Sequence, residues 1–435
     1  MTFVSTRDPN VRAGLSQALV EGIAPDGGLY VPARVPALSP ASFPDPAALD
    51  TVGPCLLGPF AEGDPLGAEI AAICREAFVF PAPLAGLAGA PGPASVLELY
   101  HGPTCAFKDF GAGFLAASLE RIRRGAARRL TVLVATSGDT GGAVAAALHG
   151  RAWVDVVLLY PKGLVSPRQA HQLACWGGNV RTFAVAGTFD DCQRIVKAAF
   201  RDPVLSRALD LSSANSINVG RLLPQMTYYA SASLAIWRAE GRRPNFIVPT
   251  GNLGNAAACV WAREMGLPIG DIWLATNANR PIPDYLESGE WRPRPSVATL
   301  ASAMDVGDPS NMERLRWLFP DVGALRGRVS ARAVSDDEIR EEIRAGAASL
   351  DRVWCPHTAT AARVYRQLVR DRADEHWVLV ATAHPAKFSE IVEPLVGREV
   401  PMLPALELIL RLPRQEEDLA ATLDALRDRL LASAL

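Results

Sequence analysis

The strongest constraint on the fold of this chain is a regular alternation, from Val96 onward, of short apolar segments with longer amphipathic ones. The apolar segments have the length of buried strands, whereas the amphipathic segments have the period of helices. The predicted strands are Val96–Tyr100, Leu130–Ala135, Val154–Tyr160, Val180–Val185, Phe246–Val248, Ile272–Ala275 and Trp377–Ala381. The predicted helices are Phe110–Arg124, Gly141–His149, Ser166–Trp176, Phe189–Phe200, Leu222–Glu240, Asn255–Met265, Asp336–Ala347, Ala359–Arg370 and Phe388–Leu395. This alternation predicts an α/β fold in which helices cover both faces of parallel sheets.

Residues 1–95 differ from this pattern because they are rich in proline and glycine. They contain two helical patterns, Leu15–Gly22 and Leu66–Phe78, and a tight turn leading into a short strand at Ala24–Pro32. We found no acid–base pair or ligand cluster here, so the segment is predicted to be an N-terminal accessory domain. The segment Pro81–Pro93 is interpreted as a linker.

The length of 435 residues suggests about three domains. Residues 96–400 are predicted to form two α/β subdomains, because two sheets fit this length better than one; the smaller would cover roughly residues 110–220. Residues 401–435 are predicted to form a C-terminal helical tail, with Pro413–Leu435 as a charged amphipathic surface helix.

The charge and the cysteine and histidine content argue against several classes of partner. The 46 acidic and 44 basic side chains give a net charge of −2 without any basic block, so neither nucleic acid nor a membrane surface is expected as a partner. The seven cysteines are scattered and form no Cys-x-x-Cys pair, and the six histidines show no metal-ligand spacing; we expect buried thiols and no metal. Without an apolar stretch of about 18 residues or a recognisable leader, the chain is expected to be cytoplasmic.

Lys108 is the outstanding candidate for amine chemistry. The chain has only four lysines, Lys108, Lys162, Lys197 and Lys387, and arginine cannot act as an amine nucleophile. Lys108 lies between Phe107 and Phe110 at the start of a predicted helix, where the helix dipole and apolar neighbours disfavour the ammonium form. The alternative is an ordinary solvated lysine in the first turn of a helix.

Two glycine-rich turns follow predicted strands and precede predicted helices. Ala135–Gly142 offers hydroxyl groups and consecutive backbone amides, and Pro249–Asn255 offers two glycines that allow close backbone approach to a ligand. Neither turn has the pattern of a nucleoside-triphosphate loop. Each could be a plain capped turn, but together they favour a ligand with two anionic ends.

Two further segments carry polar groups. Ser212–Arg221 is dense in hydroxyl and amide side chains and ends in Arg221, which can bind an oxyanion in bidentate fashion. Thr382 comes directly after a predicted strand and could donate a hydrogen bond to a ring nitrogen, although it could also simply cap a helix. His384, between Ala383 and Pro385, is interpreted as a structural histidine.

Considered together, these motifs resemble the threonine synthase family, whose members are pyridoxal 5'-phosphate (PLP) enzymes of fold type II, the fold of the tryptophan synthase β-subunit. The similar motifs are His-Gly-Pro-Thr-x-x-Phe-Lys-Asp-Phe around Lys108, Thr-Ser-Gly-Asp-Thr-Gly, Gly-Asn-x-Gly-Asn and Thr-Ala-His-Pro-Ala-Lys-Phe. The likeness extends over nearly the whole chain. The chain departs from the family pattern at Leu253, where the family usually has Phe, and at Thr250, which replaces a common Ser.

The resemblance implies a role for each matching residue. Lys108 would form the Schiff base with PLP, Thr382 would face the pyridine nitrogen, and Asp139 would lie beside the ring hydroxyl. The implied phosphate site consists of Gly251, Asn252, Leu253 and Asn255. The residues implied to receive the carboxylate or phosphate of the substrate are Ser137, Thr140, Asn218 and Arg221.

The implied reaction converts O-phospho-L-homoserine and water into L-threonine and phosphate, the last step of threonine biosynthesis, by γ-elimination and β-addition of water. The closest alternative is a related PLP lyase, either a threonine or serine dehydratase or a phospho-lyase that yields a keto acid. A non-catalytic sensor with the same fold is an alternative from a different class. Monomer and homodimer both remain open.

Overall fold

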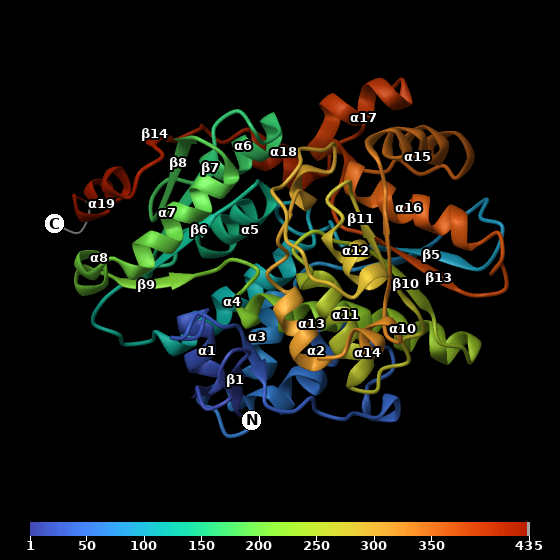
Figure 1. Cartoon of the computed structure of the whole chain (residues 1–435), viewed down its shortest axis with the longest axis horizontal. Helices are drawn as coiled ribbons and strands as arrows, with labels where there is room; N and C mark the ends of the chain where they lie inside the picture. Colours follow the sequence, from blue (N-terminus) through green and yellow to red (C-terminus); the bar gives the residue numbers. More distant parts are fainter. Residues whose placement is uncertain (433–435) are drawn as a thin grey trace.

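The computed structural model describes residues 1–432, in which two α/β lobes lie side by side above an N-terminal part (Figure 1). Three sheets are present within this described range, one in each lobe and one near the N-terminus. None of the helices in the described residues is both long and apolar enough to cross a membrane.

The larger lobe contains a six-stranded sheet. Its strands, in spatial order, are β12 (Ser330–Ala333), β11 (Ile272–Thr276), β10 (Asn245–Pro249), β13 (Trp377–Ala381), β5 (Ala94–Glu98) and β4 (Leu84–Gly86). All neighbouring strands are parallel except β4, which pairs antiparallel with β5. Phe246 and Val248 of β10 belong to one hydrophobic core, whereas Ile247 belongs to another, so both faces of this sheet are buried. That double burial explains why the strand is a continuous apolar run.

The smaller lobe contains a five-stranded parallel sheet. Its spatial order is β14 (Glu417–Ala420), β8 (Val180–Ala186), β7 (Val154–Pro161), β6 (Leu130–Ala135) and β9 (Asp210–Ser213). Alternate residues again face opposite cores: Val132 packs in the core shared with the N-terminal part, and Leu133 packs in the outer core of this lobe.

The N-terminal part is a small antiparallel sheet with helices. Its strands are β1 (Phe3–Ser5), β2 (Arg12–Ala13) and β3 (Tyr30–Pro32), and its helices are α1 (Leu15–Glu21), α2 (Leu49–Leu57) and α3 (Ile70–Ala77). Helix α3 contacts α4 (Lys108–Ile122) of the smaller lobe, and α2 contacts α10 (Met226–Glu240). One continuous hydrophobic core joins all three parts. The N-terminal part therefore packs against α4 and α10 and supports both helices.

The remaining elements connect or cover the sheets. The remaining α-helices are α5 (Asp139–Leu148), α6 (Pro167–Ala174), α7 (Phe189–Arg201), α8 (Pro203–Ala208), α9 (Val219–Leu222), α11 (Gly254–Glu264), α12 (Pro281–Ser288), α13 (Met312–Leu318), α14 (Val322–Arg326), α15 (Asp336–Ser349), α16 (Pro356–Leu368), α17 (Ser389–Val396), α18 (Pro404–Leu410) and α19 (Leu423–Leu431). The short 3-10 helices are η1 (Pro40–Ser42), η2 (Gly58–Ala61), η3 (Pro65–Ala68), η4 (Leu223–Gln225), η5 (Ser302–Met304) and η6 (Pro385–Phe388).

Two sequence-based expectations are wrong. The predicted linker Pro81–Pro93 contains β4, which forms the edge of the larger sheet. The tail Pro413–Leu435, whose last three residues lie outside the described range, is not one helix, because Glu417–Ala420 forms strand β14 beside β8. Only Leu419 of β14 faces the core, so this edge strand lacks the apolar alternation by which a strand is predicted.

Candidate active site

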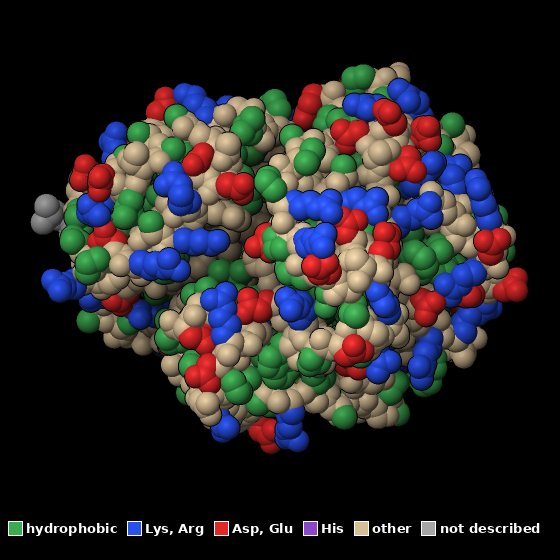
Figure 2. Space-filling view, in the orientation of Figure 1, with side chains coloured by type: hydrophobic (Ala, Val, Ile, Leu, Met, Phe, Trp, Pro, Cys, Tyr) green, Lys and Arg blue, Asp and Glu red, His purple; other side chains and the backbone are tan. Residues whose placement is uncertain are grey.

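A cavity of about 770 Å³ lies between the two lobes, at the carboxyl ends of β6, β10 and β13. Figure 2 shows the molecular surface hollowed between the lobes. Ligands in open parallel sheets bind at this edge because the turns that follow the strands converge there. Every site residue predicted from the sequence lines the cavity, with the exception of Asn218.

Lys108 is the first residue of α4, and its side chain lies in the cavity. Its Nζ lies 5.5 Å from the ring centre of Phe107. Burial lowers the pKa of Lys108 to about 8; the nearby cations Lys387 and Arg221 act in the same direction, and the carboxylate of Asp139 opposes them. Roughly a tenth of this lysine is therefore an uncharged amine at pH 7, far more than for a lysine with the ordinary pKa of about 10.4, and nucleophilic attack requires this form.

The turn after β10 forms a cradle of backbone amides. Gly251 is packed so closely that an added Cβ atom would lie 2.6 Å from the Cα of Met304. Leu253 adopts a left-handed conformation with φ of 62° and directs the chain into α11. The first N–H groups of α11 have no intrahelical acceptor, so the turn presents free donors to the cavity.

Two asparagines of this turn have different functions. Asn252 fastens the turn: its Oδ1 accepts from the N–H of Ser310 at 2.6 Å, and its C=O accepts from Asn311 at 2.9 Å. Asn255 uses its Oδ1 to accept hydrogen bonds from the hydroxyls of Tyr228 and Tyr229, and its buried Nδ2 has no partner in the described residues. That amide nitrogen is an oriented donor available for a ligand.

Thr382 follows β13 and faces the cavity with a hydroxyl that has no partner among the described residues, although the residue is only 5% exposed. Buried hydroxyl groups are normally hydrogen-bonded, so this one indicates a ligand atom opposite. The backbone N–H of Thr382 donates to the Oγ1 of Thr358 at 3.3 Å, which fixes the strand end.

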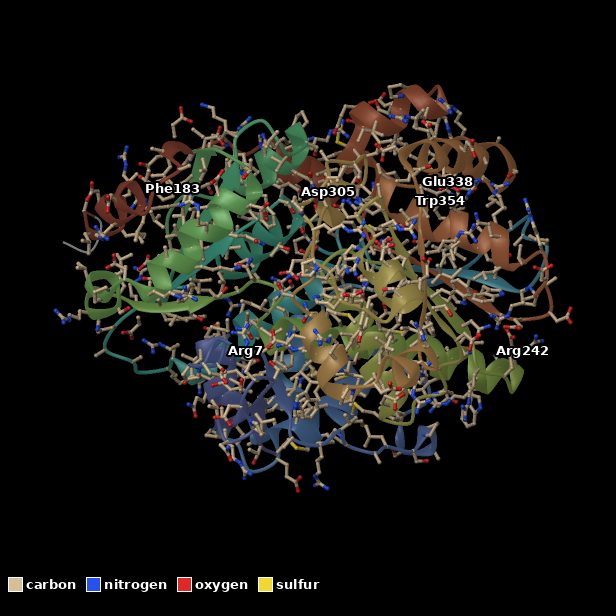
Figure 3. The ribbon with its side chains drawn as sticks, viewed as in Figure 1. Arg7, Phe183, Arg242, Asp305, Glu338 and Trp354 are labelled. Carbon is tan, nitrogen blue, oxygen red and sulfur yellow. The ribbon has the colours of Figure 1, made fainter. Side chains whose placement is uncertain are left out.

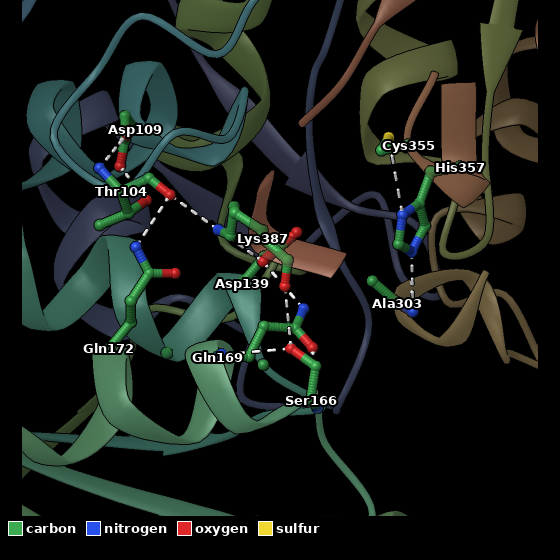
Figure 4. Close-up of polar contacts among 12 residues, drawn as sticks. Thr104, Asp109, Asp139, Ser166, Gln169, Gln172, Ala303, Cys355, His357 and Lys387 are labelled. Carbon is green, nitrogen blue, oxygen red and sulfur yellow. Dashed lines mark hydrogen bonds and ion pairs between the residues drawn. The ribbon is translucent and has the colours of Figure 1, made fainter. Parts of the chain in front are cut away.

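Asp139 begins α5 and is buried beside the cavity (Figure 4). Its Oδ1 accepts from Gln169 at 2.9 Å and pairs with the Nζ of Lys387 at 2.8 Å. Burial alone would raise the pKa of Asp139, but the cations of Lys387 and Lys108 outweigh this and hold it well below its usual range. The carboxylate is thus ionised and can only accept hydrogen bonds.

Arg221 provides a buried positive charge close to the hydroxyl-bearing residues Ser137 and Thr140, which line the same cavity. Its Nη1 donates to the C=O of Ala214 at 2.7 Å, whereas its Nε has no partner in the described part of the chain. Burial lowers the pKa of Arg221 to about 10, so the guanidinium remains charged near neutral pH. This corner can hold an anion.

The prediction that Asn218 contacts the substrate is not supported. Its side chain is completely buried outside the cavity, where Nδ2 donates to the carbonyl groups of Leu19 and Ser213 at 2.9 and 3.0 Å. Its Oδ1 caps α9 by accepting from the N–H of Gly220 at 2.9 Å. Asn218 therefore supports the helix that carries Arg221, a role that an N-cap asparagine has as readily as ligand binding.

The sequence analysis missed two parts of the cavity wall. His357, at the start of α16, accepts a hydrogen bond from the N–H of Ala303 at 3.1 Å, and burial lowers its pKa to about 4, so it is neutral. The segment Met304–Asp308 closes the cavity from the larger lobe. Its Asp305, which lies between the lobes in Figure 3, is held by Thr299 and Asn277, each at 2.7 Å. Neither part directly follows a predicted strand, and neither was assigned a role in the site from the sequence, although residues 301–307 resemble the central segment of the threonine synthase family.

The donor set fits PLP, the cofactor that the motifs imply. The amide cradle and the free Nδ2 of Asn255 suit a phosphate, the unpaired hydroxyl of Thr382 suits a ring nitrogen, and the Lys108 amine suits an aldehyde. All of these groups line one cavity.

Comparisons with known proteins agree with this donor set. The chain matches the family models described as "Threonine synthase N terminus" over residues 2–78, "Pyridoxal-phosphate dependent enzyme" over 82–383 and "Threonine synthase, C-terminal" over 358–429. It is 39% identical to the threonine synthase of Haemophilus influenzae over 100% of both chains and 38% identical to that of Escherichia coli over 98% of each.

Solved structures show the same relationship. The crystal structure of threonine synthase from Escherichia coli superimposes with a TM-score of 0.90 at 36% identity, covering 100% of both chains. The PLP-bound threonine synthase from Brucella melitensis gives a TM-score of 0.89 at 34% identity, covering 100% of this chain and 99% of that one. By its sequence, its fold and the donors in its cavity, the chain belongs to the threonine synthase family of PLP-dependent lyases of fold type II.

Proposed function

We propose that the cavity binds PLP through Lys108 and converts O-phospho-L-homoserine and water into L-threonine and phosphate. The observation that carries this proposal is the arrangement of a lysine of lowered pKa, an amide cradle, an unpaired threonine hydroxyl and a buried arginine around one cavity. In this proposal the set would supply a nucleophilic amine, a phosphate site, a partner for the ring nitrogen and a site for the anions of the substrate.

Each residue has a definite task in the proposed reaction. When bound, PLP supplies an electron sink for the negative charge that develops at substrate carbons. With PLP and substrate bound, the Lys108 amine would accept and return protons at adjacent substrate carbons; a pKa of about 8 suits both directions near neutral pH. Thr382 would offer the ring nitrogen a neutral hydroxyl group as its hydrogen-bond partner. Because no carboxylate would then stabilise a positive charge there, the unprotonated form of the ring nitrogen is favoured.

The anionic groups of the substrate are assigned to a second set of residues in the cavity lining. We propose that the Arg221 guanidinium, with the hydroxyl groups of Ser137 and Thr140, binds the carboxylate and the phosphate. The position of Arg221 in the cavity lining and its burial support this assignment, because a guanidinium binds oxyanions more strongly when water is excluded.

Product analysis with O-phospho-L-homoserine tests this function. We expect the wild-type enzyme to release threonine and phosphate in equal amounts, and Lys108→Ala to lose activity by several orders of magnitude. Lys162→Ala is the matched control, because Lys162 lies on the surface in an ion pair with Asp418. Release of a keto acid and ammonia instead of threonine would identify the alternative PLP lyase.

We further propose a cytoplasmic location. The seven cysteines, all within the described residues, are free thiols, and six of them are buried. Thiols of this kind suit a reducing compartment. Fractionation of cells of the source organism, with immunodetection of the chain, tests this assignment.

A further inference from the structure

Lys387 is a fully buried charge that the proposed reaction does not use. Its side chain in η6 has 0% exposure, and its Nζ donates to the C=O of Thr104 at 2.7 Å and pairs with Asp139 at 2.8 Å (Figure 4). Asp139 is itself buried. By contrast, the lysine–aspartate pair of Lys162 and Asp418 is more than half exposed on both sides.

Stability alone does not account for this pair. Removing two charges from water costs several kcal/mol for each ion, and an apolar pair of equal volume is often as stable or more so. The position of the pair suggests a different explanation, because Asp139 lines the cavity that holds the Lys108 amine. The charge of Asp139 raises the proton affinity of Lys108, whereas the charge of Lys387 lowers it.

The hydrogen bonds of Asp139 show how its two oxygens are divided. Both Lys387 and Gln169 bind Oδ1, which leaves Oδ2 without a partner among the described residues. The position of Lys387 is in turn fixed by Thr104 and by the attachment of η6 to α6, where the hydroxyl of Ser166 donates to the C=O of Lys387 at 3.2 Å. The cation is thus held rigidly on one side of the carboxylate.

The charged side chains that act on Lys108 are Asp139 of α5, Lys387 of η6 and Arg221 of α9. The other ionisable residues that line the cavity are Asp190, Arg194, Lys197 and Arg201 of α7, Arg294, Asp305 and Asp308 of the larger lobe, and His357 of α16, and Asp109 follows Lys108 in α4. Asp109 accepts from the N–H and hydroxyl of Thr104 at 2.9 and 2.6 Å and is thereby engaged elsewhere. His357 is neutral, and Asp305 is engaged by Thr299 and Asn277. Asp139 is the carboxylate whose charge favours the ammonium form of Lys108.

We propose that Lys387 is a positioning residue for the Lys108 amine: by neutralising Asp139, it prevents this carboxylate from holding Lys108 as a protonated ion pair. The proposal rests on the proposed role of Lys108 as the residue that binds the cofactor. Without Lys387, Asp139 would have Lys108 as its remaining lysine partner, and the nucleophilic amine would be lost at neutral pH.

The small number of lysines makes a direct test possible. Lysine labelled with ¹³C at Cε gives four side-chain signals in the full, cofactor-free chain, and the signal missing from Lys108→Ala identifies Lys108. Its chemical shift is then followed against pH. We expect Lys387→Met to raise the Lys108 midpoint by at least about one pH unit, because a cation is lost and a carboxylate becomes available. Asp139→Asn should lower it.

Controls separate this role from a structural one. The double variant Asp139→Asn/Lys387→Met removes both charges and should bring the midpoint back between those of the two single variants. Lys162→Met breaks the surface pair and should leave the midpoint unchanged. A midpoint in Lys387→Met equal to that in Lys162→Met would overturn the proposal.

Folding is checked by thermal unfolding of each variant. If Lys387→Met does not fold, Asp139→Asn and the double variant still decide the question, since they differ only in the Lys387 cation. The proposal requires a lower Lys108 midpoint in Asp139→Asn, and equal midpoints would contradict it. Borohydride reduction that attaches PLP to a lysine other than Lys108 would refute the proposed function of Lys108 without altering the titration result.

Discussion

At the scale of single residues, Asn255 combines two tasks in one amide. Its Oδ1 is engaged by two tyrosine hydroxyls, which fixes the orientation of the unpaired Nδ2, and the residue lines the cavity. The orientation is fixed before any ligand arrives, so little side-chain entropy remains to be lost on binding.

Asn255→Asp tests this assignment with a minimal change of shape. The aspartate can still accept from both tyrosines, but it replaces a donor by a negative charge opposite the proposed phosphate. A hydrogen bond to a charged group contributes about 1.5–3 kcal/mol, so we expect the Kd for PLP to rise roughly 10- to 100-fold. Titration of the cofactor-free chain with PLP measures this. An unchanged Kd, with an unchanged unfolding midpoint of the cofactor-free chain, would place the phosphate elsewhere.

His357 makes a prediction about pH. The folded chain binds a proton on this residue only near pH 4, whereas the unfolded chain binds it near 6.5. Between these values the unfolded state therefore holds more protons, and the contribution of His357 to stability falls as the pH falls, by about 3 kcal/mol over the whole interval.

Replacing His357 by Gln should reduce this pH dependence. We expect the loss of stability between pH 7.5 and 4.5, measured as the shift of the urea midpoint, to be smaller in His357→Gln than in the wild type. His149→Gln is the control, because His149 is exposed on the surface. If both variants lose stability as the wild type does, His357 is not held neutral in the folded chain.

At the scale of structural elements, the turn between β10 and α11 depends on a close contact with Met304, the last residue of η5. A Cβ on Gly251 would lie 2.6 Å from the Cα and 2.9 Å from the carbonyl oxygen of Met304, both backbone atoms that cannot move aside cheaply. A Cβ on Gly254, at the start of α11, would meet its nearest neighbour only at 3.6 Å. The packing therefore requires glycine at position 251, whereas position 254 has room for a Cβ atom.

Alanine substitution of these two glycines gives a matched comparison. Gly251→Ala should destabilise the cofactor-free chain by about 1–3 kcal/mol through overpacking, whereas Gly254→Ala should have no such cost because alanine favours the helix. Thermal unfolding of the cofactor-free chains measures the difference. A Gly251→Ala variant as stable as Gly254→Ala would contradict the tight packing of the turn against Met304.

The turns also show which parts of a site can be predicted from sequence. Gly251 and Thr382 follow strands that are buried on both faces, and such strands are marked by continuous apolar runs, so the position of the turns follows from the strands. Asn218 shows the limit of this reasoning: an asparagine before a helix can cap it or bind a ligand, the sequence is the same in both cases, and the structure shows the capping contact. The Lys387–Asp139 pair joins distant segments, which no local pattern records.

At the scale of the whole molecule, the C-terminal segment completes the smaller lobe. β14 adds a strand beside β8, and α19 packs on α7, with Leu426 fully buried in the outer core of the lobe. Both parallel sheets were predictable from their long apolar strands, and the family was predictable from several motifs in the same chain. The edge strands β4, β9, β12 and β14 were not, because each has only three or four residues and few of them are fully buried.

The contribution of this segment can be measured with one leucine. Leu426→Ala should cost about 2–5 kcal/mol, because it leaves a cavity in a closed core. Leu408→Ala in α18 is the control, since that side chain is 64% exposed. Limited proteolysis should cut the smaller lobe of Leu426→Ala faster than that of the control. Equal cleavage rates would mean that the C-terminal segment does not stabilise the lobe.

The central claim is that the cavity exchanges the γ-phosphate of O-phospho-L-homoserine for a hydroxyl group on the neighbouring carbon. Turnover in ¹⁸O-labelled water, followed by mass spectrometry of both products, tests this claim most directly. The proposed reaction predicts threonine with one ¹⁸O atom in its hydroxyl group and phosphate without any ¹⁸O, because the carbon–oxygen bond is broken. Labelled phosphate, or release of a keto acid and ammonia in place of threonine, would contradict it.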